Sequence, residues 1–114
     1  MADQLRIGEV KEYIDQHLSE ELPLKKIATK FNYTLWTLKR HFKIRYAVSI
    51  SKYILEIRME GALIMLINRQ ASIVEIAEMV GYNNVSSFSH TFRKYFGKAP
   101  TIYMANDELV HKLK

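Results

Sequence analysis

Two stretches of the sequence concentrate side chains that donate hydrogen bonds or carry positive charge. In the first stretch these side chains are Trp36, Thr37, Arg40 and Lys43. In the second stretch they are Ser86, Ser87, His90, Arg93 and Lys94. If each stretch is a helix with Leu38 or Phe88 facing inward, a turn of about 100° per residue places all of them on the outward half. Neither outward half carries a carboxylate, so both suit an anionic surface that accepts hydrogen bonds.

The sequence offers little support for enzyme chemistry. Its four histidines are far apart and lack the spacing of metal ligands: His17, His41, His90 and His111. There is no cysteine, which excludes disulfides, thiolate zinc sites and cysteine nucleophiles. No glycine-rich phosphate loop or nucleophile motif is present. We therefore expect no enzyme activity, no cofactor and no metal site.

Positive charge is segregated along the chain. The net charge is +5 and the isoelectric point is about 9.5. Eight lysines and arginines and no acid lie between Leu22 and Leu55, and a second stretch without acids runs from Met79 to Asn106. Such segregation indicates a polyanionic partner, with a merely solvated basic face as the alternative.

No targeting segment is visible in the sequence. The chain begins Met-Ala-Asp-Gln, without the basic region and apolar core of a secretory signal. The longest dense apolar run, Ala62 to Ile67, is far too short to span a membrane. We expect a cytoplasmic protein without membrane contact.

The spacing of apolar residues is helical almost throughout. It predicts an all-α fold of the homeodomain-like type with about seven helices. These helices are expected at about 7–18, 24–31, 35–43, 50–68, 73–80, 85–96 and 100–103. From Ala62 to Ile67 the fourth helix is apolar nearly all round, which predicts that several of its sides are covered. Gly61 lowers helix propensity by about 1 kcal/mol, so we expect it to mark a point of close packing.

Several helix ends have recognisable capping residues. Ser49 is expected to cap the fourth helix, and Ser72 with Glu75 forms a capping-box pattern at the fifth. Asn83 or Asn84 is expected to cap the sixth helix. Gly97 is expected to end that helix, and Pro100 to begin the last one.

The sequence contains an internal repeat, which relates residues 24–43 to residues 73–93. Each copy predicts a short helix, a tight turn and a second helix. A helix-turn-helix needs positive φ just after its first helix, which Gly81 adopts freely and Asn32 tolerates. Ala28 and Ala77 are small enough to let the two helices of each copy cross closely. The repeat and the charge together predict a DNA-binding domain with two helix-turn-helix units.

This prediction divides the chain into parts. Residues 1–114 form one DNA-binding domain, with helix-turn-helix subdomains at 5–46 and 72–105 and a connector helix at 49–68. A connector of about 19 residues is roughly 28 Å long, near the ~34 Å between successive major grooves. We therefore expect one chain to bind an asymmetric site as a monomer, with a possible bend in the duplex.

The outward side chains divide by the part of the DNA that they suit. Arg40 can bind guanine O6 and N7 together, and Trp36 can cover a thymine methyl or a sugar if it is exposed rather than part of the core. From the residues alone, the expected base contacts are Trp36, Thr37, Arg40, Ser86, Ser87 and His90. The expected phosphate contacts are Lys43, Arg45, Asn84, Arg93, Lys94 and Lys98.

From about Leu5 to Met104 the sequence resembles the DNA-binding domain of the AraC/XylS family of bacterial transcription regulators. The most specific motif is Ile73-x-Glu75-Ile76-Ala77-x-x-Val80-Gly81-Tyr82, followed by Phe88-Ser89-x-x-Phe92-Arg93-Lys94-x-Phe96-Gly97-x-x-Pro100-x-x-Tyr103. The first unit and connector add Leu38-x-Arg40-x-Phe42-Lys43, Tyr53-Ile54, Arg58 and Ala62-x-x-Met65. The resemblance also implies a base contact for Lys39.

The resemblance implies promoter binding and contact with RNA polymerase, usually as an activator. The resemblance covers nearly the whole chain, which leaves no room for a separate effector-binding domain. The chain therefore resembles a stand-alone regulator or a domain of a longer one. Three residues depart from the family pattern: Ala47 for a glycine, His90 for an arginine and Met104 for an arginine. Because His90 is the weaker donor, we expect the first unit to dominate specificity. The alternatives are a helical protein-interaction module and a nonspecific architectural DNA binder.

Overall fold

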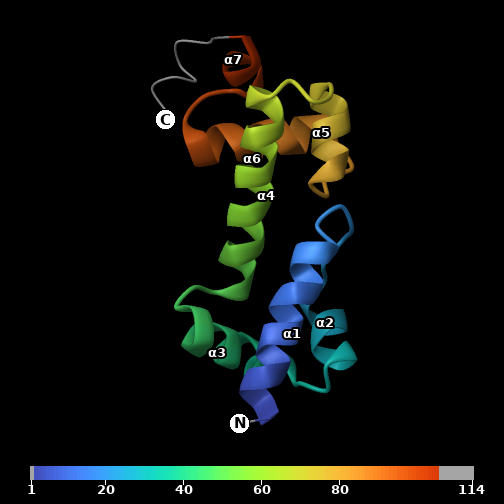
Figure 1. Cartoon of the computed structure of the whole chain (residues 1–114), viewed down its shortest axis with the longest axis vertical. Helices are drawn as coiled ribbons and strands as arrows, with labels where there is room; N and C mark the ends of the chain where they lie inside the picture. The colour runs from blue at the N-terminus through green and yellow to red at the C-terminus, as the bar shows by residue number, and fades with distance from the viewer. Residues whose placement is uncertain (1, 106–114) are drawn as a thin grey trace. The chain divides into compact units, whose positions relative to one another are not determined.

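The structure, a computed structural model, describes residues 2–105, with side chains from Arg6 to Met104. Within this range it contains seven helices and no strand (Figure 1). The helices are α1 (Ala2–Gln16), α2 (Leu24–Lys30), α3 (Leu35–Tyr46), α4 (Ile50–Ile67), α5 (Ile73–Met79), α6 (Val85–Phe96) and α7 (Pro100–Ala105). The predicted all-α class with about seven helices is therefore confirmed.

The chain divides into two compact units, Met1–Ile57 and Arg58–Lys114, and the division falls inside α4. In the first unit α3 packs against both α1 and α2, and in the second unit α6 packs against α5 and α7. Each unit thus contains one helix-turn-helix pair, α2–α3 or α5–α6. A further helix, α1 or α7, packs against the second helix of that pair.

Each unit has a core of the apolar residues that the helical spacing turns inward. The first core gathers Ile7, Val10 and Ile14 from α1 with Leu38 and Phe42 from α3. In the second unit the aromatic rings form a chain of contacts. The ring centroids of Phe88 and Phe92 are 5.7 Å apart, and those of Phe92 and Tyr103 are 5.5 Å apart. The buried residues of α3 and α6 determine which sides of these two helices remain outward.

The turns of the two helix-turn-helix pairs have the predicted backbone. Asn32 follows α2 at φ 61° and Gly81 follows α5 at φ 94°, so both positive-φ predictions are confirmed. Ala28 and Ala77 are buried where the helices of each pair meet.

The capping predictions are also confirmed. The Ser49 side chain accepts a hydrogen bond from Lys52 N at 3.1 Å, and Ser72 with Glu75 forms a complete capping box. Asn84, not Asn83, caps α6. A cap of this kind satisfies amides that the first helical turn leaves unpaired, and contributes about 1 kcal/mol.

Of the two predictions for α4, the one for Gly61 is wrong. A Cβ atom added to Gly61 would meet no heavy atom within 4 Å, so this glycine does not mark a close packing point. Ala62 and Leu66 are buried, but the Ile64 side chain is 57% exposed. Leu63, Met65 and Ile67 are partly buried, so the second half of α4 is covered on several sides as predicted, with Ile64 left exposed.

No helix within residues 2–105 is long and apolar enough to cross a membrane.

Candidate nucleic-acid interface

The outward side of α3 is set by its buried residues and its N-cap. Leu38 and Phe42 are fully buried, which turns the opposite side of the helix to solvent. Thr34 caps the helix, and its hydroxyl oxygen accepts a hydrogen bond from Thr37 N at 3.1 Å. Trp36 is 68% exposed on this outward side, so the prediction of an exposed tryptophan is confirmed.

Trp36 and Arg40 are in contact on the outward side. The guanidinium carbon of Arg40 lies 5.3 Å from the centroid of the Trp36 ring, one helical turn along. A cation–π contact at an exposed site contributes about 0.5–1 kcal/mol, so it restricts the arginine without removing it from solvent. The pair presents a planar set of N–H donors beside a large apolar edge.

The other predicted residues of α3 differ in exposure. Lys39, Lys43 and Arg45 are exposed, and the guanidinium of Arg45 lies 5.5 Å from the Tyr46 ring centroid. Thr37 is half-buried, and its hydroxyl oxygen accepts a hydrogen bond from the Thr34 hydroxyl at 2.8 Å. A threonine hydroxyl can donate as well as accept, so Thr37 can also donate a hydrogen bond to a base edge.

The outward side of α6 has the predicted polar residues but no aromatic–arginine pair. Phe88 and Phe92 are fully buried on the inner side. The side chains that the structure leaves exposed on the outer side are Ser86, Ser87, His90, Arg93 and Lys94. Lys98 is exposed just after the left-handed Gly97.

Asn84 is engaged within the protein. Its side-chain oxygen accepts hydrogen bonds from Ser86 N at 2.7 Å and from Ser87 N at 3.1 Å. Only the amide N–H groups of Asn84 are left for a phosphate, since the cap occupies its acceptor.

Sequence reasoning missed two exposed features of the first unit. Lys25, Lys26 and Lys30 are all exposed on α2, where they line a shallow concavity with Thr29. Ile44 on α3 is 65% exposed, two turns after Trp36. The lysines could have been found from the helical phase of α2, because buried Ile27 and Ala28 leave the opposite arc outward. The same helical phase places Ile44 outward, since it lies four residues after Arg40, although isoleucine is more often a core residue.

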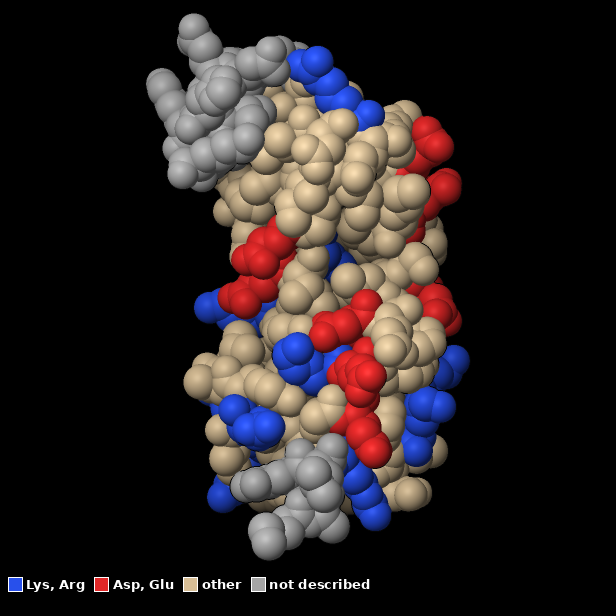
Figure 2. Space-filling view, viewed as in Figure 1, with Lys and Arg blue, Asp and Glu red and all other residues tan. Residues whose placement is uncertain are grey.

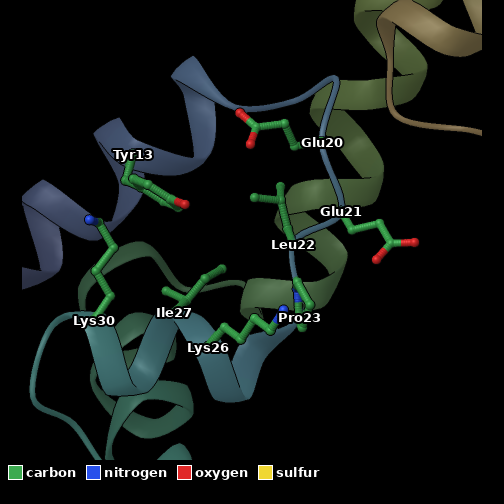
Figure 3. A pocket seen from close by; sticks show the side chains of 8 residues that line it. All are labelled: Tyr13, Glu20, Glu21, Leu22, Pro23, Lys26, Ile27 and Lys30. Carbon is green, nitrogen blue, oxygen red and sulfur yellow. The ribbon is translucent and has the colours of Figure 1, made fainter.

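A pocket of about 300 Å³ lies beside α2, away from the recognition residues (Figure 3). The end of α1, the following loop and α2 line it, and no residue of α3 does. Lys26 and Lys30 are balanced there by Glu20 and Glu21. With equal numbers of acids and bases, the pocket is not suited to an isolated phosphate.

Acidic side chains of the first unit lie on a different helix from the recognition residues. Glu9, Glu12 and Asp15 are exposed on α1, and acidic side chains gather over this part of the unit in Figure 2. Lys11 forms an ion pair with Asp15 at 3.1 Å. Neither α2 nor α3 carries an acid, so the outward sides of these two helices suit a polyanion.

Within the described residues, no group of three or more histidines, aspartates or glutamates is placed to hold a metal ion.

Comparison with known proteins now adds to this geometry. A family model described as a helix-turn-helix domain matches residues 27–106. The regulatory protein SoxS of Salmonella typhimurium is 31% identical over 103 residues, which cover 90% of this chain and 96% of SoxS. A crystal structure of a transcriptional regulator from Chromobacterium violaceum, described as of the AraC-type DNA-binding domain-containing proteins, has a TM-score of 0.75 and 29% identity. That match covers 91% of this chain and 93% of the other.

The chain belongs to the AraC-type helix-turn-helix family. The resemblance in the sequence is thereby confirmed, and this AraC-type chain is a domain for sequence-specific DNA binding and transcription regulation. Relatives differ in length. The Msm operon regulatory protein of Streptococcus mutans is 35% identical over 95 residues, covering 83% of this chain but 34% of that protein. The chain therefore spans about a third of that relative and nearly all of SoxS.

Proposed function

We propose that a single chain reads an asymmetric site in duplex DNA, with α3 supplying most of the base discrimination. The observation that carries this proposal is the exposed Trp36–Arg40 pair, in which the guanidinium lies 5.3 Å from the indole centroid. A fork of N–H donors suits guanine O6 and N7, and the adjoining indole edge suits a thymine methyl. Lys39 lies on the same exposed helix and is proposed as a further base contact.

The second unit contributes the weaker base contacts. Ser86, Ser87 and His90 are exposed on α6 and can each bond to a base edge. None of them forms the two parallel hydrogen bonds that an arginine or an asparagine makes, each such pair being worth about 1–3 kcal/mol of discrimination. Thr37 in the first unit belongs to this weaker group as well, because its hydroxyl is linked to the Thr34 cap.

Phosphate contacts flank the base contacts in both units. The proposed residues of the two recognition helices and their ends are Lys43, Arg45, Asn84, Arg93, Lys94 and Lys98. We add Lys25 and Lys26 at the start of α2, because the first helix of a helix-turn-helix crosses the DNA backbone. These contacts add affinity and salt dependence but no sequence preference.

The regulatory action follows from the family. We propose that the chain binds as a monomer in the cytoplasm, since its two unlike units remove the need for a symmetric partner. Activation of transcription through contact with RNA polymerase is the proposed outcome of binding. No cofactor is needed for any of these steps.

Selection from a random duplex DNA pool tests the proposal. Purified chain is mixed with the pool at near-physiological salt, and the stoichiometry of the shifted complex is measured. We expect an asymmetric consensus bound by one chain, with a guanine in the segment that Arg40→Ala ceases to discriminate. Absence of enrichment, with binding that disappears as salt rises, would refute sequence-specific reading by this chain.

A further inference from the structure

Ile44 is an apolar side chain on the outward side of α3. It is 65% exposed, and it lies four residues after Arg40 and eight after Trp36. Residues four apart on a helix are neighbours on its surface, because the projection turns by only about 40° between them. Leu38 and Phe42 are buried on the other side, so Trp36, Arg40 and Ile44 form one exposed row. We call these three residues the α3 row.

The charges around Ile44 indicate what covers it. Its neighbours in the sequence, Lys43 and Arg45, are exposed cations, and neither α2 nor α3 carries an acid. A surface of this charge attracts a polyanion. The alignment that pairs Lys43 with Arg93 also pairs Ile44 with Lys94, which is exposed on α6. At this position α6 therefore has an ammonium group for a phosphate, whereas α3 has a branched hydrocarbon among cations.

The major groove of DNA offers one kind of partner to an apolar side chain. The C5-methyl group of thymine is the apolar group that a base presents there. Isoleucine suits this group because branching at Cβ leaves one strongly preferred χ1 rotamer in a helix, so its methyl groups are held in place before the contact forms. Contact between the two removes apolar surface of both from water. A phosphate placed over Ile44 would lose water without gaining a hydrogen bond from that residue.

We propose that Ile44 is a specificity-determining residue, which contacts the C5-methyl group of a thymine in the major groove. This rests on the proposed function, in which Arg40 binds a guanine and Trp36 covers a thymine methyl. The α3 row then meets a methyl group, a pair of acceptors and a second methyl group in that order along the groove. Residues three or four apart on a zinc-finger helix contact successive base pairs, so the two methyl groups should lie about two or three base pairs apart.

Removal of single methyl groups from the DNA tests this contact. Deoxyuridine replaces each thymine of the selected duplex in turn, which removes the C5-methyl group and keeps the O4 acceptor. Binding of the wild-type chain, Ile44→Ala and Trp36→Ala is measured by fluorescence anisotropy at one fixed salt concentration. Double-mutant cycles then give the coupling between each methyl group and each side chain. Ile44 is exposed and alanine has the higher helix propensity, so the circular-dichroism melting curve of Ile44→Ala should match that of the wild type.

We expect deoxyuridine at one thymine to weaken wild-type binding by about threefold to fivefold, which corresponds to one methyl group removed from contact. Ile44→Ala should bind the thymine duplex at least as weakly, and deoxyuridine at that position should then cause no further loss. The same deoxyuridine should still weaken binding by Trp36→Ala, since that variant keeps Ile44.

A second variant gives α3 the residue that α6 has at the equivalent position. Ile44→Lys should steepen the slope of log K against log salt concentration by about 0.9, because the ammonium group adds one phosphate contact. It should also bind the thymine and deoxyuridine duplexes equally well at the position that Ile44 contacts.

Two results would overturn this assignment and leave sequence-specific binding intact. In the first, no deoxyuridine weakens binding by the wild type. In the second, the loss at every sensitive thymine persists in full in both Ile44→Ala and Ile44→Lys, so the methyl groups are contacted by other residues. A chain that selects no consensus from the random pool refutes the proposed function itself, and the Ile44 contact is then refuted with it.

Discussion

The two helix-turn-helix units share a backbone but differ in what they present to solvent. Each places a positive-φ residue after its first helix, caps its second helix with a polar side chain, and buries two apolar residues at matching positions. The outward residues diverge. Where α3 has Trp36 and Arg40, α6 has Ser86 and His90, and where α2 has three lysines, α5 has acids and apolar groups.

This difference shows that the fold and the contact chemistry are set by separate residues. The shared positions are buried or capping residues, which determine the helix-turn-helix geometry. The divergent positions are exposed, so they can change without cost to the core. The exposed residues of each unit can therefore change their contact chemistry while the helix-turn-helix fold is kept.

The largest effect that we expect separates the two recognition helices. Arg40→Ala should weaken binding to the selected site by about 1–3 kcal/mol and relax discrimination at one or two base pairs. His90→Ala should cost less than about 1 kcal/mol, because a single hydrogen bond is lost. Fluorescence anisotropy with the selected duplex and its single-base variants, at one fixed salt concentration, measures both. Equal losses would show that α6 contributes as much specificity as α3.

The next prediction concerns the residues that end α3 and α6. Ala47 has φ 60° and Gly97 has φ 86°, at equivalent positions of the repeat. Since a left-handed conformation costs an L-residue roughly 1–2 kcal/mol, Ala47→Gly should raise the free energy of unfolding by about 1 kcal/mol. Gly97→Ala should lower it by a similar amount. Urea denaturation followed by circular dichroism gives both values. The comparison fails if Ala47→Gly destabilises the chain.

A smaller effect should distinguish α2 from the rest of the first unit. Lys25→Ala with Lys26→Ala should lower the slope of log K against log salt concentration by about 1–2, at roughly 0.9 per phosphate contact. The preferred base sequence should not change. Lys11→Ala is the control, because it removes one charge from α1, where Lys11 pairs with Asp15. A similar slope change in the control would mean that net charge alone is responsible.

The smallest effect is a pH dependence confined to the second unit. Hydrogen bonds from Ser72 lower the pKa of the Glu75 carboxyl in the folded state. A lowered folded-state pKa gives stability that is present above the unfolded value and lost as the pH falls through the folded one. The capping contribution of Glu75 should therefore disappear on acidification below about pH 4. In urea titrations, the difference between wild type and Glu75→Gln should shrink over that window, and a constant difference would argue against it. The α2 helix has Pro23 at its N-cap position and no side-chain cap, so we expect no equivalent pH dependence from that helix.

The helical period, the caps and the turns could be predicted from the sequence alone. They depend on contacts within a few residues, as in the Ser72–Glu75 capping box and the positive φ of Asn32. The motif of the second unit identified the family for the same reason, since its residues define one local geometry. The candidate DNA-contacting residues also followed from local phase, because a helix with Leu38 inward must turn Arg40 outward.

Tertiary structure alone decided which side chains are covered. The apolar run of α4 and the glycine before it indicated close packing, yet Ile64 is exposed and Gly61 has open space beside it. Met79 is 49% exposed although Ile76, three residues before it on the same helix, is buried. Residue spacing also does not show that Arg40 contacts the Trp36 ring. Nor does it show that the Tyr53 hydroxyl donates a hydrogen bond to the Asp15 carboxylate. Burial depends on what lies across from a helix, and a local pattern records only the helix itself.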